Sequence, residues 1–206
     1  MIFKHLRFSI PFTIATFLLP CTGLLRGDDG SMMDHSMAKK SMAQSLNQLR
    51  GREFEIRFLK DMIMHHQSAV DMAKLAQKNT KRTELNEMGD NIISAQNKEI
   101  AQMKTWLSDW YQEDSSMGTM NGMDHGMGKG SMAKMDASMH KLHKSSDKAF
   151  DLLFLREMIK HHQDGVDMSE MVSERAEHSE LKDLAANIIK DQSREIQQMK
   201  AWQKEW

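Results

Sequence analysis

The chain repeats itself at a constant offset of 96 residues. The stretch FLKDMIMHHQSAVDMA at 58–73 returns as FLREMIKHHQDGVDMS at 154–169, and the same register continues on both sides without a gap. The matched pairs outside this stretch are Phe54 with Phe150, Glu84 with Glu180, Gln96 with Gln192, Glu99 with Glu195, Met103 with Met199, Trp106 with Trp202 and Trp110 with Trp206. Any fold of this chain is therefore built from two copies of one unit.

Each copy has the apolar pattern of a helical hairpin. Helical spacing runs over about 52–77 and, after the polar break KNTKRT, over about 81–111; the second copy has it at about 146–173 and 178–206. Both prolines of the chain lie within its first twenty residues, so no other proline interrupts a helix. One hairpin cannot bury its own apolar face. We therefore expect an all-α four-helix bundle at 50–206, with hairpins at 50–111 and 146–206.

The segments outside the hairpins lack an apolar stripe. Residues 112–145 are rich in Gly, Ser and Met, and we expect them to form a long crossover linker between the hairpins. Residues 28–49 form a polar tract with Met and His that we expect to be flexible.

The first 27 residues have the pattern of a signal peptide. Lys4 and Arg7 precede FSIPFTIATFLL, an apolar run too short to cross a bilayer as a stable helix. Pro20 stands before Cys21 where a lipoprotein signal needs a small residue, which favours a soluble exported protein over a lipid-anchored or uncleaved one. We expect a periplasmic or otherwise exported protein with no stable membrane span in its mature form. Cys21 is the only cysteine, so the mature chain contains no disulfide.

Methionine is unusually frequent in this chain, with 21 residues. Eleven of them lie in segments with almost no other apolar residues, so a core does not explain them: Met32, Met33, Met37, Met42, Met117, Met120, Met123, Met127, Met132, Met135 and Met139. The formal net charge of -1 gives no electrostatic reason to expect nucleic acid as a partner.

Adjacent histidines stand in the first helix of each hairpin. At about 100° per residue, His66 falls at the centre of the apolar face and His65 on its flank, beside Asp61, Met62 and Met72. The second copy repeats this arrangement with Glu157, Met158, His161, His162 and Met168. Of each adjacent pair, His65 and His161 have the better surroundings for a metal ligand.

The second helix of each hairpin carries polar residues within its apolar face. Gln96 and Glu99 share one helical face with Met103 and other apolar residues, and Gln192, Glu195 and Met199 repeat this in the second copy. Burying them without partners is costly, so we expect a facing histidine or a bound ion. Two explanations stay open for the core alone: metal ligation, or a hydrogen-bonded histidine with methionines that fill gaps.

The segments outside the helices favour metal binding over the purely structural explanation. MDHSM at 33–37 and MDHGM at 123–127 repeat a Met-Asp-His-small-Met pattern. The candidate ligands there are Met33, His35, Met37, Met123, His125, Met127, Met135, Met139, His140 and His143. Thioether sulfur with imidazole nitrogen favours copper, above all Cu(I), with Cu(II) also bound and Ag(I) behaving similarly. Sacrificial methionines in a flexible linker explain the composition but not the histidine at the centre of both patterns.

An enzyme is less well supported. A carboxylate-bridged di-iron centre uses Glu-x-x-His, whereas Asp61 and His65, like Glu157 and His161, are four residues apart. A variant iron or manganese oxidase stays a weak alternative, as does a metal-free structural or interaction bundle. No nucleophile elbow or phosphate-binding loop is present in the sequence.

The paired motif FLxxMIxHHQxxVDM and IIxxQxxEIxQMKxW resembles a ferritin-like family that is catalogued as a domain of unknown function and whose exported members are often Met-rich. The resemblance covers about 50–206. It implies a ferritin-like bundle and, in copper-linked members, binding of Cu(I) and Cu(II) that protects the cell. It also implies ligand roles for Met62, His65, His66, Met72, Met103, Met158, His161, His162, Met168 and Met199.

We therefore expect an exported protein that sequesters or carries copper and contributes to copper resistance or homeostasis, without turning over a substrate. Its expected partners are copper and silver ions, together with copper-sensing or export proteins. Position 64 is Met in one copy, whereas the second copy has Lys160, so the two halves need not bind equally.

Overall fold

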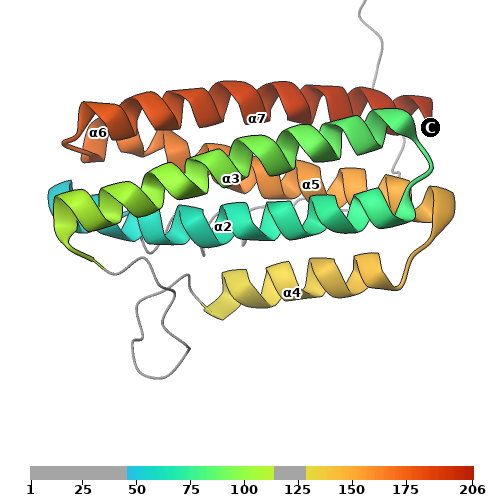
Figure 1. Ribbon diagram of the computed structural model, residues 1–206, viewed down its shortest axis with the longest axis horizontal. Helices are drawn as coiled ribbons and strands as arrows, with labels where there is room; N and C mark the ends of the chain where they lie inside the picture. The colour runs from blue at the N-terminus through green and yellow to red at the C-terminus, as the bar shows by residue number, and fades with distance from the viewer. Residues whose placement is uncertain (1–45, 114–128) are drawn as a thin grey trace, which may run out of the picture.

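The structure is a computed structural model that describes residues 46–113 and 129–206 (Figure 1). Its helices are α2 (Gly51–Asn79), α3 (Thr83–Tyr111), α4 (Lys129–His143), α5 (Asp147–Glu170), α6 (Val172–Arg175) and α7 (Ser179–Glu205). The predicted all-α fold is confirmed, and the long helices begin and end within a few residues of the expected positions. None of the helices in the described ranges is long and apolar enough to span a membrane.

The two hairpins pack against each other through their first helices. Helix α2 packs along α3, α5 packs along α7, and α2 also contacts α5. Figure 1 shows these four helices running side by side, with α4 alongside them. Helix α3 ends where Gln112 adopts a left-handed conformation, and its N–H is bonded to the carbonyl of Ser108.

Two features differ from the expectation. Helix α4 lies inside the segment predicted to be a linker, and it contacts both α2 and α5. It is attached through Leu142, which is fully buried, and through the half-buried Met139. The third helix was expected to continue to about residue 173, but α5 ends at Glu170 and α6 adds one separate turn.

The core consists of two apolar clusters, one toward each end of the bundle. The first cluster joins the start of α2 to the end of α3 and the start of α7, and includes Phe54, Phe58, Leu107 and Leu181. The second cluster joins the end of α2 to the start of α3 and of α5, and includes Ala73, Leu85, Phe150 and Phe154. The motif histidines lie between them along α2 and α5.

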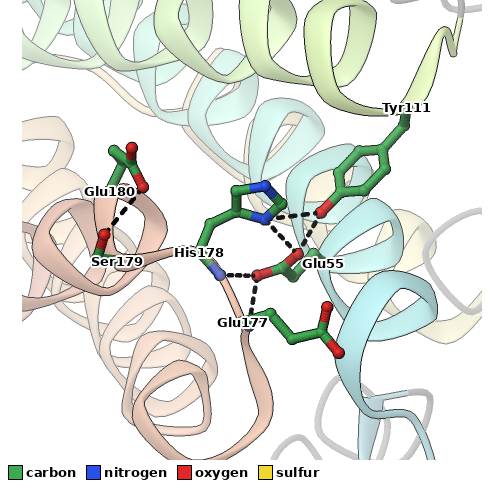
Figure 2. A network of polar contacts seen from close by, with 6 residues as sticks. All are labelled: Glu55, Tyr111, Glu177, His178, Ser179 and Glu180. Atoms are coloured by element: carbon green, nitrogen blue, oxygen red, sulfur yellow. Dashed lines mark hydrogen bonds and ion pairs between the residues drawn. The ribbon is translucent and has the colours of Figure 1, made fainter.

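A buried carboxylate fixes the corner between α6 and α7 (Figure 2). Glu55 on α2 accepts hydrogen bonds from the backbone N–H groups of Glu177 at 2.7 Å and His178 at 2.8 Å. Its other oxygen accepts from His178 Nδ1 at 2.8 Å and from the hydroxyl of Tyr111. The His178 ring stacks on Trp110 with 3.9 Å between ring centroids. This corner of the second hairpin is therefore tied to both helices of the first.

The opposite end of the bundle uses the matching positions of the repeat. Asp151, which corresponds to Glu55, forms an ion pair with Arg82 at 3.4 Å between Nε and Oδ2. The Arg82 guanidinium lies 3.9 Å from the centroid of the Trp206 ring. Each end therefore combines a buried carboxylate, a cationic or imidazole partner and an indole.

We predict that Glu55→Gln lowers the free energy of unfolding by about 3 kcal/mol at neutral pH, because the amide cannot accept all these bonds. Burial raises the pKa of Glu55, but the bonds from Tyr111 and His178 outweigh it, and the pKa lies below the ordinary 4.5. The stabilisation is therefore complete above about pH 4.5 and is lost as the pH falls further. Urea unfolding measures it, with the exposed Glu87→Gln as control; equal stability of the two variants would contradict this prediction.

Candidate metal centre

A polar layer lies in the middle of the bundle, between the two apolar clusters. Its members are buried side chains from all four long helices of the hairpins: His65 and His66 on α2, Gln96 on α3, His161 and His162 on α5, and Gln192 on α7. Within 46–113 and 129–206, no three histidine, cysteine, aspartate or glutamate side chains form a metal-binding group by themselves.

His66 and His162 are each anchored by a carboxylate from the partner helix of their own hairpin. His66 Nε2 lies 2.6 Å from Glu99 Oε2, and His162 Nε2 lies 2.7 Å from Glu195 Oε2. The expectation of a facing histidine is thus confirmed for Glu99 and Glu195, whereas Oε1 of Gln96 and Oε1 of Gln192 have no hydrogen-bond partner among the described residues. Nε2 of each ring makes the contact with the carboxylate. Nδ1 of each ring has no hydrogen-bond partner in the described part of the chain.

His65 and His161 meet each other across the interface between the hairpins. The sequence placed His65 on the flank of α2, but α5 covers that flank and both rings are buried. Their centroids are 3.8 Å apart, and His65 Nε2–H donates to the carbonyl oxygen of His161 at 3.0 Å. Among the described residues, His65 Nδ1 and both ring nitrogens of His161 have no hydrogen-bond partner.

The electrostatics keep these two imidazoles neutral. Burial lowers the pKa of His65 and His161 well below the ordinary 6.5, and the neighbouring imidazoles lower it further. A neutral imidazole retains one lone pair, which is the form that binds metal. In the same region, burial raises the pKa of Asp61 to about 6, although Arg57 opposes the shift.

The six core methionines of the motif divide between the two apolar clusters. The first cluster holds Met62 of α2, Met103 of α3 and Met168 of α5. The second holds the matching positions, Met158 of α5, Met199 of α7 and Met72 of α2. The sequence grouped Met62 and Met72 around one histidine, but the structure assigns them to opposite sides of the polar layer. Each set of three contains one thioether from the other hairpin.

The candidate ligands outside the hairpins are only partly described. Met33, His35, Met37, Met123, His125 and Met127 lie outside the described residues. On α4, Met135 and Met139 are half-buried and His140 and His143 are exposed. Ser138 Oγ donates to Glu157 Oε2 at 2.7 Å, which attaches α4 to α5 one turn before His161.

Gly165 also lies in this centre, although it was not among the residues expected there. A Cβ atom at this position would lie 2.6 Å from Gln192 Oε1 and 3.0 Å from His65 Cε1. The available signal was a difference between the copies, because the matching position of the first copy is Ala69.

We predict that the buried neutral histidines make the protein less stable in mild acid. Below about pH 6.5 the unfolded chain binds protons that the folded rings do not, so the free energy of unfolding falls by up to about 1.4 kcal/mol per pH unit for each ring. Asp61 has the opposite effect on the free energy of unfolding. Because its pKa is raised to about 6, the folded chain binds this proton more readily than the unfolded chain and gains stability as the pH falls from about 6.

The pH slope of unfolding in urea, compared between variants, isolates the imidazole contribution. His161→Gln should have a smaller slope than the wild-type chain between about pH 6.5 and 5, whereas the exposed His140→Gln should keep it. An unchanged slope in His161→Gln would show that this ring is protonated in the folded state.

A family model described as a domain of unknown function (DUF305) matches residues 25–88 and 55–203. The chain is similar to CopM in the Cu(II)-bound form, with 33% identity and a TM-score of 0.60 over 74% of this chain and 98% of that chain.

CopM in the Cu(I)-bound form is 34% identical, with a TM-score of 0.61 over 74% of this chain and 96% of that chain. The Ag-bound form obtained by soaking is 33% identical, with a TM-score of 0.61 and the same coverage. No curated protein matches the chain. By its sequence and its structure, the chain belongs to the DUF305 family.

Proposed function

We propose that this protein binds copper, as Cu(I) and Cu(II), and also Ag(I), and that it sequesters or carries the ion outside the cytoplasm without turning over a substrate. The observation that carries the proposal is the polar layer: four buried imidazoles each keep an unpartnered ring nitrogen within the described core. Three buried thioethers lie in the apolar cluster on either side.

The anchoring of the rings supports a ligand role. A metal-binding histidine usually donates its second N–H to a carboxylate or a carbonyl, which fixes the tautomer and aims the free nitrogen. Glu99 and Glu195 supply this contact to His66 and His162, and the carbonyl of His161 supplies it to His65. Neutral imidazole and thioether together suit copper better than harder ions such as Mg²⁺ or Mn²⁺.

The similarity to CopM, whose solved forms hold Cu(I), Cu(II) and Ag, supports the same cargo for this chain. The basic and apolar N-terminus supports export to the periplasm or beyond, and a role in copper resistance or homeostasis follows from that location. We further propose that the Met and His segments outside the hairpins capture ions, which the more rigid positions of the bundle then hold.

The proposal is tested by competition with a Cu(I) chelator. Met62→Leu/Met103→Leu/Met168→Leu keeps the apolar volume but removes one set of thioethers, and we expect at least about a tenfold loss in the affinity of the bundle for Cu(I). Met88→Leu, a buried methionine outside both sets, is the matched control. No competition by a fully helical wild-type protein would refute copper binding, and copurified iron or manganese would favour the oxidase instead.

A second variant tests the role of the flanking segments. Replacing Met33, His35, Met37, Met123, His125 and Met127 by leucine or glutamine should reduce the number of copper ions bound per chain. Helicity by circular dichroism should stay unchanged, because these positions lie outside the hairpins. Unchanged stoichiometry, measured by metal analysis after gel filtration, would rule out ion capture by these segments.

A further inference from the structure

The two copies of the repeat match in sequence around the central histidines but differ in hydrogen bonding. His65 Nε2–H donates to the carbonyl of His161 at 3.0 Å. The reciprocal bond, from His161 to the carbonyl of His65, is not formed: in the described chain neither nitrogen of His161 has a partner. Two equivalent copies therefore provide one anchored and one unanchored imidazole.

The fourth residue after each histidine explains the difference. In an α-helix, Cβ atoms tilt toward the N-terminus, so the side chain at position i+4 lies beside the carbonyl of residue i. Gly165 lies four residues after His161, and Ala69 lies four residues after His65. The carbonyl of His161 is therefore open to an approaching ring, whereas the methyl group of Ala69 lies beside the carbonyl of His65.

The distances around Gly165 show that groups of His65 and Gln192 lie in the space that a Cβ atom would need. A Cβ at residue 165 would lie 3.0 Å from His65 Cε1, tighter than nearly all such contacts, and 2.6 Å from Gln192 Oε1, closer than real Cβ atoms approach. Alanine at this position would thus push both groups away from α5. In the first copy the matching residue is Ala69, which is fully buried and carries a methyl group.

We infer that Gly165 is a positioning residue that makes the two central histidines inequivalent: His65 is held as the Nε2–H tautomer and coordinates the ion through Nδ1, while His161 is the unanchored ligand. This inference rests on the proposed copper binding for its functional meaning, but the tautomers themselves exist without metal. His65 binds without breaking a hydrogen bond. His161 makes none with the described residues, so either of its ring nitrogens is open to the ion.

The buried surroundings support this assignment. Both rings are buried, and Nδ1 of His65 has no hydrogen-bond partner among the described residues. A carbonyl oxygen only accepts hydrogen bonds, so the proton of His65 lies on Nε2 and the lone pair on Nδ1.

The test is NMR on the metal-free full chain labelled with ¹⁵N-histidine. In the wild-type protein, His65 should show a protonated Nε2 whose proton exchanges slowly with water, and His161 should show no such proton. Gly165→Ala should abolish the slowly exchanging proton of His65. A folded Gly165→Ala protein that keeps it would overturn the inference.

Ala69→Gly is the converse variant, and it keeps the test decisive even if Gly165→Ala fails to fold. Opening the carbonyl of His65 should give His161 a slowly exchanging Nε2–H of its own. Ala73→Gly, one turn further along the same buried face, controls for the lower helix propensity of glycine and should leave both rings as in the wild type. Absence of a new His161 signal in a folded Ala69→Gly protein would also overturn the inference.

Titration with Ag(I), which is diamagnetic, separates this inference from the proposed function. The expected result is a large ¹⁵N shift at His65 Nδ1 while its Nε2–H persists. Binding of Ag(I) through Nε2 of His65 would refute the inference and leave metal binding intact. Predicted tautomers without any Ag(I) or Cu(I) binding would confirm the positioning role of Gly165 and refute the proposed function.

Discussion

The constraint on which this fold depends is the burial of four imidazoles where two helical hairpins meet. A buried polar ring without a partner is costly, so the bundle supplies an acceptor to most of them from nearby helices. Glu99 and Glu195 accept hydrogen bonds from His66 and His162, and the backbone of α5 accepts one from His65. The resulting polar layer divides the core into two apolar clusters and leaves ring nitrogens without a hydrogen-bond partner among the described residues.

The repeat explains why the supporting contacts come in pairs. At one end Glu55 holds His178 beside Trp110, and at the other Asp151 holds Arg82 beside Trp206. These two corners fix the ends of the hairpins and so set the register in which α2 and α5 meet. The symmetry is broken at the centre, where Gly165 of the second copy corresponds to Ala69 of the first.

The contacts within each hairpin were predictable from the sequence. Helical periodicity places His66 at the centre of an apolar face and Glu99 within the facing stripe, and the two side chains bond as that pattern indicates. Contacts between the hairpins were not predictable in this way. His65 looked like a flank residue, because local spacing shows which face of α2 is apolar but not which neighbour covers its edge. Helix α4 was missed although Met135, Met139 and Leu142 have helical spacing, because methionines among Gly and Ser were attributed to metal binding rather than to packing.

The helices, their duplication and the types of side chain gathered at the centre could be inferred before the fold was known, because they follow from residue chemistry and from spacing within one helix. The folded chain alone reveals that the ring of His65 lies against that of His161, that Met62 and Met72 belong to opposite clusters, and that the two copies differ in hydrogen bonding. These features depend on side chains about a hundred residues apart in sequence, and their distances are set by how closely α2 approaches α5 rather than by the period of either helix.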